Sequence, residues 1–285
     1  MELNIENSEQ IRELLQAGAV EKLRTIAWSG ETLAGAMHLA CLEKEVLSTL
    51  ATKHLFFKLL DSWENLVLFK AARKAMMHRG LWELPLSMKA EVHTWEILPI
   101  PLESQVAELT WIQFHRRFNA SLQASGFRGR LPTALTGALH EMADNSLRHS
   151  GSSSQHPSLG AVGYFVEQGR MTFCVVDAGR GVLESLKTNP ANADLKNDGE
   201  ALQAAVLGHA TSDPKKQMGN GFEEVHRALS DRNGRLRFRS GRAAIDLDGR
   251  GHNRNIDVSY GMSPAAGFQL VVRCVLDDFS DDSKL

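Results

Sequence analysis

The spacing of apolar residues divides the chain into a helical first part and a second part in which helices alternate with strands. Through residues 1–80, apolar side chains recur every three or four residues, the pattern of amphipathic helices. One helix is predicted to open at Ser8, a residue type that caps helix N-termini. Further helices are predicted over residues 20–27, 31–50, 55–60 and 63–77. Residues 1–84 are therefore expected to be an all-helical region that serves a partner or self-association.

Prolines at positions 85, 99 and 101 mark a change of pattern. A strand is predicted over 92–100, a long helix over 103–124, and another helix from Pro132 to His149, since a first-turn proline loses no helix hydrogen bond. Further strands are expected at 161–166, 170–176, 235–240 and 268–275, with helices near 200–207 and 222–229. This pattern predicts an α+β fold for residues 85–285: an α/β sandwich with helices on one face of a mixed, mostly antiparallel sheet.

Composition adds few constraints. The chain has 285 residues, of which 43% are hydrophobic and 23% charged, with a net charge of −2, so no basic field favours nucleic acid or membrane surfaces. Cys41, Cys174 and Cys274 lack metal-ligand spacing and are expected to be small buried side chains. No apolar run reaches the roughly 18–20 residues of a membrane helix, and polar residues rather than a signal peptide follow Met1. A cytoplasmic protein is expected.

The first candidate motif lies on the predicted helix that ends at His149. Glu141, Asn145 and His149 are spaced four apart, along one margin of the apolar face that includes Met142 and Ser146. An amide oxygen there can ligate Mg²⁺, and a carboxylate can orient or deprotonate water. Read alone, the motif is equally typical of polar residues beside a core face.

Two further motifs are rich in glycine. The apolar strand ending at Val176 runs into Asp177-Ala178-Gly179-Arg180-Gly181, where glycines permit close backbone approach and an ionised aspartate accepts the hydrogen bonds that an adenine amine donates. Read alone, it is an ordinary strand-to-loop turn. Gly219-Asn220-Gly221 precedes a predicted helix, whose free N–H groups favour phosphates. Lys215 and Lys216 are expected to be solvated loop charges.

Together, these motifs resemble the signature of the GHKL superfamily, which includes sensor histidine kinases, type II topoisomerases, mismatch-repair ATPases and a heat-shock chaperone. Glu141 and Asn145 match its asparagine box, and the segment 177–181 matches its Asp-x-Gly-x-Gly box. Gly219-Asn220-Gly221 matches its lid-closing glycine box. The resemblance runs from about residue 91 to the end of the sequence.

The resemblance implies ATP and Mg²⁺ as ligands. Asn145 would hold Mg²⁺, and Asp177 would read the adenine, with Gly179 and Gly181 shaping the base pocket. The glycines of the third motif would cradle the phosphates, and Glu141 would be the base in hydrolysing members. One departure is that Phe268 follows Gly267 where the family usually has a threonine, whose hydroxyl supports the adenine aspartate.

Four functions are compatible with such a pocket. His38, His54 and His78 lack the residue pattern of a phospho-acceptor box, which disfavours a complete histidine kinase. Only a short segment follows Val275, which disfavours a topoisomerase-like ATPase with a transducer domain. The favoured hypothesis is an ATP-dependent switch with slow hydrolysis that engages a protein partner. The alternative is a stand-alone serine/threonine or histidine protein kinase like the bacterial anti-sigma factors.

Two other patterns favour ordinary structural roles. Arg235, Arg237 and Arg239 alternate along a predicted strand, and we expect them on its solvated face rather than in an anion or nucleic-acid patch. Asp246-x-Asp248-Gly249 resembles the start of a calcium loop, but its glycine comes too early and no distal glutamate completes it.

Overall fold

The computed structural model describes twelve parts of the chain: residues 2–19, 22, 30–48, 63, 66–77, 94–100, 105–149, 160–208, 210–212, 229, 233–248 and 255–276. Within them, seven α-helices accompany a seven-stranded antiparallel sheet. The predicted α+β fold is confirmed. The predicted helices over 20–27, 55–60 and 222–229 lie outside the described residues, apart from isolated positions.

The sheet has the strand order β3-β4-β5-β9-β6-β7-β8, and every neighbouring pair is antiparallel. Its strands are β3 (Trp95–Pro99), β4 (Gly160–Glu167), β5 (Arg170–Asp177), β6 (Asn233–Gly241), β7 (Ala243–Asp248), β8 (Asn255–Ser259) and β9 (Ala265–Val275). β9, the last strand in sequence, lies between β5 and β6, so it joins the two antiparallel halves of the sheet.

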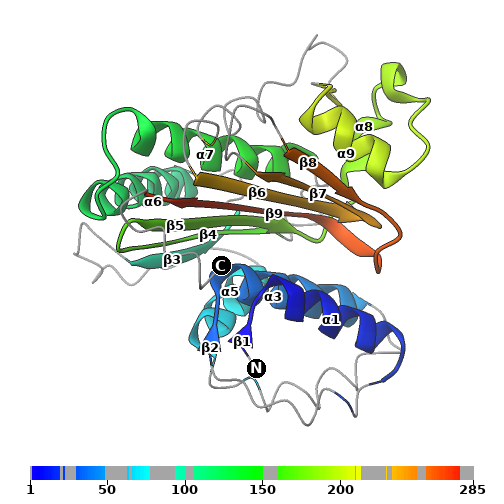
Figure 1. Ribbon diagram of the computed structural model, residues 1–285, viewed down its shortest axis with the longest axis horizontal. Helices are drawn as coiled ribbons and strands as arrows, with labels where there is room; N and C mark the ends of the chain where they lie inside the picture. The colour runs from blue at the N-terminus through cyan, green and yellow to red at the C-terminus, as the bar shows by residue number, and fades with distance from the viewer. Residues whose placement is uncertain are drawn as a thin grey trace.

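Helices cover both faces of this sheet (Figure 1). One face carries α6 (Gln105–Ala124), α7 (Leu131–His149), α8 (Val182–Leu186) and α9 (Asp198–Val206), with the 3₁₀ turn η1 (Pro190–Asn192) between the last two. The opposite face carries α1 (Ile5–Gln16), α3 (Leu33–Ser48) and α5 (Val67–Met77). The N-terminal helices thus form a third layer on the sheet.

Two apolar cores follow from this arrangement, one on each side of the sheet. Strand β5 shows why, because its side chains alternate between them: Phe173 and Val175 belong to the core under α6 and α7, whereas Cys174 and Val176 belong to the core under α3. A strand buried on both faces needs a continuous apolar run, and the sequence of β5 supplies one. All three cysteines are buried, as predicted.

The first helix begins earlier than its sequence indicates. Asn4 is the N-cap of α1 and its side chain accepts the backbone N–H of Asn7, so the prediction that Ser8 opens the helix is wrong. Ser8 lies one turn inside the helix, where its buried hydroxyl donates to the carbonyl of Ile5. Two-residue strands β1 (Glu2–Leu3) and β2 (Gly30–Glu31) also pair in parallel, within a stretch expected to be helical throughout.

The second half matches its predicted order more closely. The strands expected over 161–166, 170–176, 235–240 and 268–275 correspond to β4, β5, β6 and β9. β7 and β8 were not predicted. In the described part of the chain, no helix is long and apolar enough to cross a membrane.

Candidate functional site

Asp177 is the last residue of β5, in the middle of the sheet. Its register partner on β4 is Gly160, the first residue of that strand. Asp177 is only 1% exposed, so its carboxylate lies in the interior at the point where the strand turns into the segment 178–181. A buried carboxylate needs partners, because an unpaired charge there would be costly.

Three donors form hydrogen bonds with the Asp177 carboxylate. The backbone N–H of Gly179 donates to Asp177 Oδ1 at 2.8 Å, and Ser146 Oγ donates to Oδ2 at 3.1 Å. The backbone N–H of Phe268 is the third donor. Burial nevertheless raises the pKa of Asp177 to about 6, against the three hydrogen bonds, which lower it. The carboxylate is therefore ionised at neutral pH and can only accept hydrogen bonds.

Glycines allow other backbone to approach Asp177 closely. Gly267, the third residue of β9, has a φ of 61°. A Cβ atom at this position would lie 2.1 Å from the Asp177 carbonyl oxygen. The N–H of Gly267 donates to the carbonyl of Gly179 at 2.8 Å, which fastens the start of β9 to the loop after β5. At position 160 a Cβ atom would lie 3.0 Å from Ser146 Oγ, so Gly160 leaves room for that hydroxyl.

Gly181 continues the same loop into α8. It is the N-cap of that short helix and has a φ of 82°, a left-handed conformation that favours glycine. Ser240 of β6 holds this turn in place, since its hydroxyl accepts the N–H of Val182 at 3.0 Å and donates to the carbonyl of Gly267 at 2.7 Å. The loop 178–181 is thus fixed to both β6 and β9.

Helix α7 lies over this strand end and carries the other two predicted residues. Glu141 and Asn145 are half-buried on α7, and neither side chain has a hydrogen bond or ion pair in the part of the chain that the structure describes. The neighbouring Asp144 and Arg148 instead pair with each other at 2.7 Å on the outer side of the helix.

The structure brings together Asp177, Gly179 and Gly181, and Ser146, which directly follows Asn145 on α7, contacts Asp177. Gly219, Asn220 and Gly221 lie outside the described residues, as do Lys215 and Lys216. No group of three or more histidine, cysteine, aspartate or glutamate side chains that could hold a metal occurs within the described ranges.

Sequence reasoning missed Ser146 as a polar contributor. Its helical position placed it on the apolar face of α7, and it is indeed fully buried, but its hydroxyl is what contacts Asp177. Phe268 contributes only its backbone N–H, while its ring packs edge-on against Phe238 at 5.6 Å. The side-chain hydroxyl that contacts Asp177 thus comes from α7. The sequence feature that could have indicated this contact is a serine among apolar core positions, directly after Asn145.

The arginines of β6 differ from their prediction. Arg239 is 1% exposed and Arg237 is largely covered, because both lie under α1 and pair with its Glu9. The expected solvated face is therefore wrong for these two arginines, whereas Arg235 is partly exposed. The reason is the N-terminal layer, which covers this face of the sheet. Arg237 also binds Asp246 at 2.6 Å, which gives that aspartate a structural role on β7.

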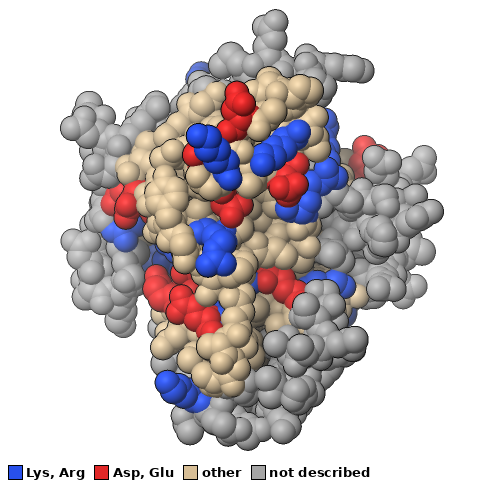
Figure 2. Space-filling view, turned by 90° about the vertical axis from the view of Figure 1, so that its right-hand side faces the viewer, with Lys and Arg blue, Asp and Glu red and all other residues tan. Residues whose placement is uncertain are grey.

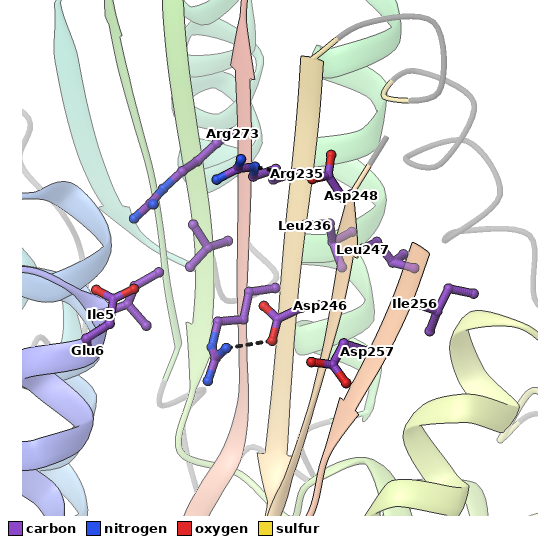
Figure 3. A pocket seen from close by; sticks show the side chains of 12 residues that line it. Ile5, Glu6, Arg235, Leu236, Asp246, Leu247, Asp248, Ile256, Asp257 and Arg273 are labelled. Atoms are coloured by element: carbon purple, nitrogen blue, oxygen red, sulfur yellow. Dashed lines mark hydrogen bonds and ion pairs between the residues drawn. The ribbon is translucent and has the colours of Figure 1, made fainter. Parts of the chain in front are cut away.

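Beside α1, the same face of the sheet is hollowed into a pocket of about 600 Å³ (Figure 3). Arg235 and Arg273 line one part of it, and Asp246 and Asp257 line another. Acidic and basic side chains are also interspersed on the coloured surface shown in Figure 2. Neither view shows a surface of one charge sign, which agrees with the low net charge.

Comparison with protein-family models and with curated protein sequences gives no match to this chain.

Proposed function

We propose that this chain binds Mg-ATP through a GHKL-type pocket at Asp177 and acts as a switch that hydrolyses ATP slowly and engages a protein partner. The observation that carries the proposal is the buried Asp177 carboxylate, held by three donors at the end of a central strand. A fold gains nothing from burying such a charge, whereas a binding site that reads a donor gains specificity from it.

Adenine fits the chemistry of this carboxylate. The exocyclic amine of adenine is a donor, and an ionised aspartate accepts only. Guanine presents a carbonyl oxygen at the corresponding position, so it would meet Asp177 acceptor to acceptor. Gly179 and Gly181, which have no side chains, leave the backbone of the loop 178–181 open to the base.

Asn145 fits the role of a magnesium ligand. Its amide is half-buried and has no partner among the described residues, and an amide oxygen is a ligand that Mg²⁺ accepts. The metal would offset the charge of the phosphates. Glu141, one helical turn earlier on the same face of α7, would orient the attacking water.

Slow hydrolysis is expected from what surrounds these two residues. Within the described ranges, no lysine or arginine forms an ion pair with Glu141 or a hydrogen bond with Asn145. A fixed cation beside the developing charge is usually the largest source of rate in phosphoryl transfer. Turnover well below about 10 s⁻¹ is therefore proposed for the isolated chain.

Protein phosphorylation is the second candidate, because the same pocket serves kinases. His38 does not suit the role of phospho-acceptor: it is 3% exposed beneath α1, and burial together with nearby Arg239 lowers its pKa well below the usual value. A kinase built on this chain would therefore phosphorylate a separate protein rather than His38.

Incubation with γ-labelled ATP tests both candidates. The protein is purified from its native host with any bound partner, and released phosphate and labelled protein are measured together. The switch predicts slow phosphate release, abolished in Asn145→Ala, without labelled protein. Label on the partner would establish the kinase, and the absence of both products and of bound nucleotide would contradict the proposal.

A further inference from the structure

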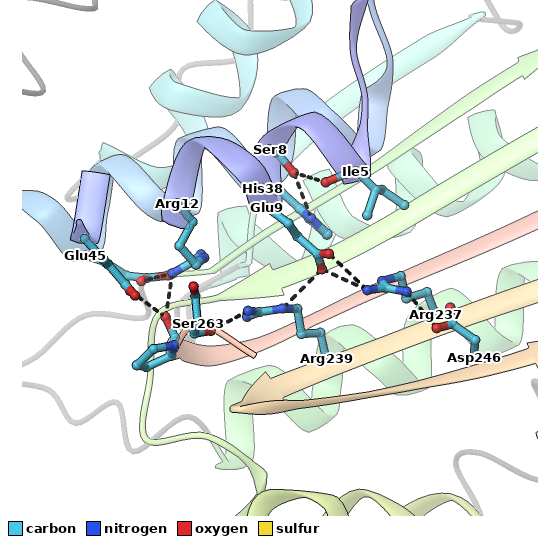
Figure 4. Close-up of polar contacts among 12 residues, drawn as sticks. Ile5, Ser8, Glu9, Arg12, His38, Glu45, Arg237, Arg239, Asp246 and Ser263 are labelled. Carbon is cyan, nitrogen blue, oxygen red and sulfur yellow. Dashed lines mark hydrogen bonds and ion pairs between the residues drawn. The ribbon is translucent and has the colours of Figure 1, made fainter. Parts of the chain in front are cut away.

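One face of α1 lies directly over the start of β9 (Figure 4). Glu9, Arg12 and Gln16 occupy this face, three and four positions apart. Arg12 Nη1 and Gln16 Nε2 each donate to the carbonyl oxygen of Pro264, both at 3.1 Å. Pro264 immediately precedes β9, so two side chains of the N-terminal layer hold the point where this strand begins.

An ion pair with α3 fixes Arg12 in this position. Arg12 is 2% exposed and its guanidinium forms a two-point ion pair with Glu45 of α3, in which Nη2 lies 2.9 Å from Oε1. A planar guanidinium bound at two points has little freedom to move. The carbonyl of Pro264 is therefore bound to a rigid α1–α3 unit.

A second link runs through Glu9. Its carboxylate lies between Arg237 and Arg239, 3.0 Å from Arg237 Nη2 and 3.2 Å from Arg239 Nε (Figure 4). Arg239 also donates to the carbonyl of Ser263. Burial lowers the pKa of Arg239 to about 10, which leaves it charged at neutral pH. Ser263 and Pro264 are thus both held from the α1 side of the sheet.

Only two residues separate Pro264 from Gly267, whose backbone lies against Asp177. Gly267 donates to Gly179 at 2.8 Å, and Phe268 donates to the Asp177 carboxylate. Helix α3 also contacts the site directly, because Cys41 Sγ donates to the Asp177 carbonyl oxygen at 3.4 Å. A continuous series of contacts therefore joins α1 and α3 to the candidate adenine aspartate.

We propose that Arg12 and Gln16 are positioning residues for the nucleotide site, so that docking of α1 on residues 263–264 sets the geometry of Gly267 and Asp177. This inference rests on the proposed ATP site and names its regulation. The two equilibria are linked: if docked α1 raises ATP affinity, bound ATP stabilises the docked helix by the same factor. A partner that displaces α1 would then release nucleotide.

The test uses the full-length chain and three variants of α1. Arg12→Lys keeps a positive charge beside Glu45 but loses the planar fork that reaches Pro264. Gln16→Ala removes only an exposed hydrogen bond, so this variant is expected to fold. It keeps the test usable if Arg12→Lys proves unstable. Glu13→Ala, on the exposed side of the same helix, is the matched control.

Two readouts are taken for each protein. The first is backbone hydrogen exchange without nucleotide, followed at Gly179 and Gly267 and, as a remote reference, at Val162 of β4. The second is ATP affinity by calorimetry. Arg12→Lys and Gln16→Ala are expected to speed exchange at the two glycines but not at Val162, and to weaken ATP binding roughly 5- to 150-fold, the usual range of such coupling. In the wild type, ATP should slow exchange in α1.

The outcomes separate the two proposals. Unchanged exchange at Gly179 and Gly267 in both variants would overturn the link between α1 and the site, whatever the ATP affinity. Faster exchange with unchanged ATP affinity would overturn its regulatory role. A wild type that binds no ATP would instead contradict the proposed function itself, and the regulation with it.

Discussion

Asp177 is a charged side chain at a position where an apolar or neutral one would fold more easily. Its carboxylate is buried, and three hydrogen bonds only partly offset its loss of solvation. The sequence correctly predicted a strand that ends at Asp177, because an apolar run that leads into Asp-x-Gly-x-Gly is visible without coordinates. It could not identify the donors, since Ser146 and Phe268 come from distant parts of the chain.

Replacement of Asp177 by asparagine is expected to stabilise the fold at pH 7.5. The pKa of Asp177 rises from 3.8 to about 6 on folding, so the folded chain binds the proton more tightly than the unfolded chain does. Stability therefore falls as pH rises through this window, and above it the ionised group costs on the order of 1–3 kcal/mol. Urea unfolding should show Asp177→Asn to be more stable than wild type at pH 7.5.

The same comparison below pH 4 supplies the contrast, since wild-type Asp177 is then mostly neutral and the advantage should largely disappear. Asp257→Asn, which removes an exposed carboxylate on β8, is the control for the loss of a negative charge elsewhere on the sheet. An Asp177→Asn variant that is less stable than wild type at both pH values would contradict the assigned environment of this carboxylate.

Gly267→Ala should damage the site more than its backbone conformation alone explains. A methyl group at position 267 would lie 2.1 Å from the Asp177 carbonyl oxygen and 2.2 Å from its Oδ1. Gly129 has a similar φ, 67° against 61°, but open space around it, so Gly129→Ala carries the same strain without the clash. Gly267→Ala should lower both the melting temperature and the ATP affinity. Gly129→Ala should lower the melting temperature alone, and only slightly. Equal losses of stability and of ATP affinity in both variants would mean that the close approach of Gly267 to Asp177 does not matter for the site.

At the scale of elements, α7 combines a core face with a half-buried polar margin. Leu135, Leu139 and Met142 pack into the core, whereas Glu141 and Asn145 lie along its margin. Helical periodicity predicted this division, and it is a local property. β7 and β8 were missed because Asp246 and Asp257 break their apolar pattern. These two residues face each other across the strand pair, and Asp246 is bound by Arg237 of β6.

Two substitutions on α7 are expected to separate binding from hydrolysis. Glu141→Gln keeps the shape of the side chain but removes a base, so ATP affinity should stay close to wild type while hydrolysis falls roughly 10²-fold or more. Asn145→Ala should lose the magnesium-dependent part of ATP binding. Calorimetry with and without Mg²⁺, together with phosphate release, measures both effects. Wild-type hydrolysis in Glu141→Gln would exclude this residue as the base.

At the scale of the whole molecule, the N-terminal helices are part of the sheet's structure. Three arginines and three carboxylates from α1, α3, β6 and β7 form largely buried ion pairs between the layers, namely Arg12, Arg237, Arg239, Glu9, Glu45 and Asp246. Sequence predicted α3 and α5 as helices but not which face of the sheet they cover. Their packing depends on pairings such as Glu9 with Arg237, 228 residues apart, which no local pattern reveals.

Glu9→Gln tests this network. The substitution preserves size but leaves Arg237 and Arg239 with less negative charge in a buried setting, and breaking one side of such a pair usually costs about 3–5 kcal/mol. Glu6→Gln, an exposed position one turn earlier on α1, is the matched control and should cost nothing measurable. Chemical denaturation of both variants decides the point, and equal stability would mean that the N-terminal layer does not depend on these ion pairs.

The central claim is that Asp177 reads adenine, and a calorimetric titration tests it most directly. Wild type and Asp177→Asn are each titrated with ATP and GTP in the presence of Mg²⁺. The account predicts micromolar-to-millimolar affinity of wild type for ATP, GTP binding weaker by roughly tenfold or more because its carbonyl meets a buried acceptor, and loss of ATP binding in Asp177→Asn. Equal affinities for ATP and GTP, or ATP binding by Asp177→Asn at the wild-type level, would contradict it.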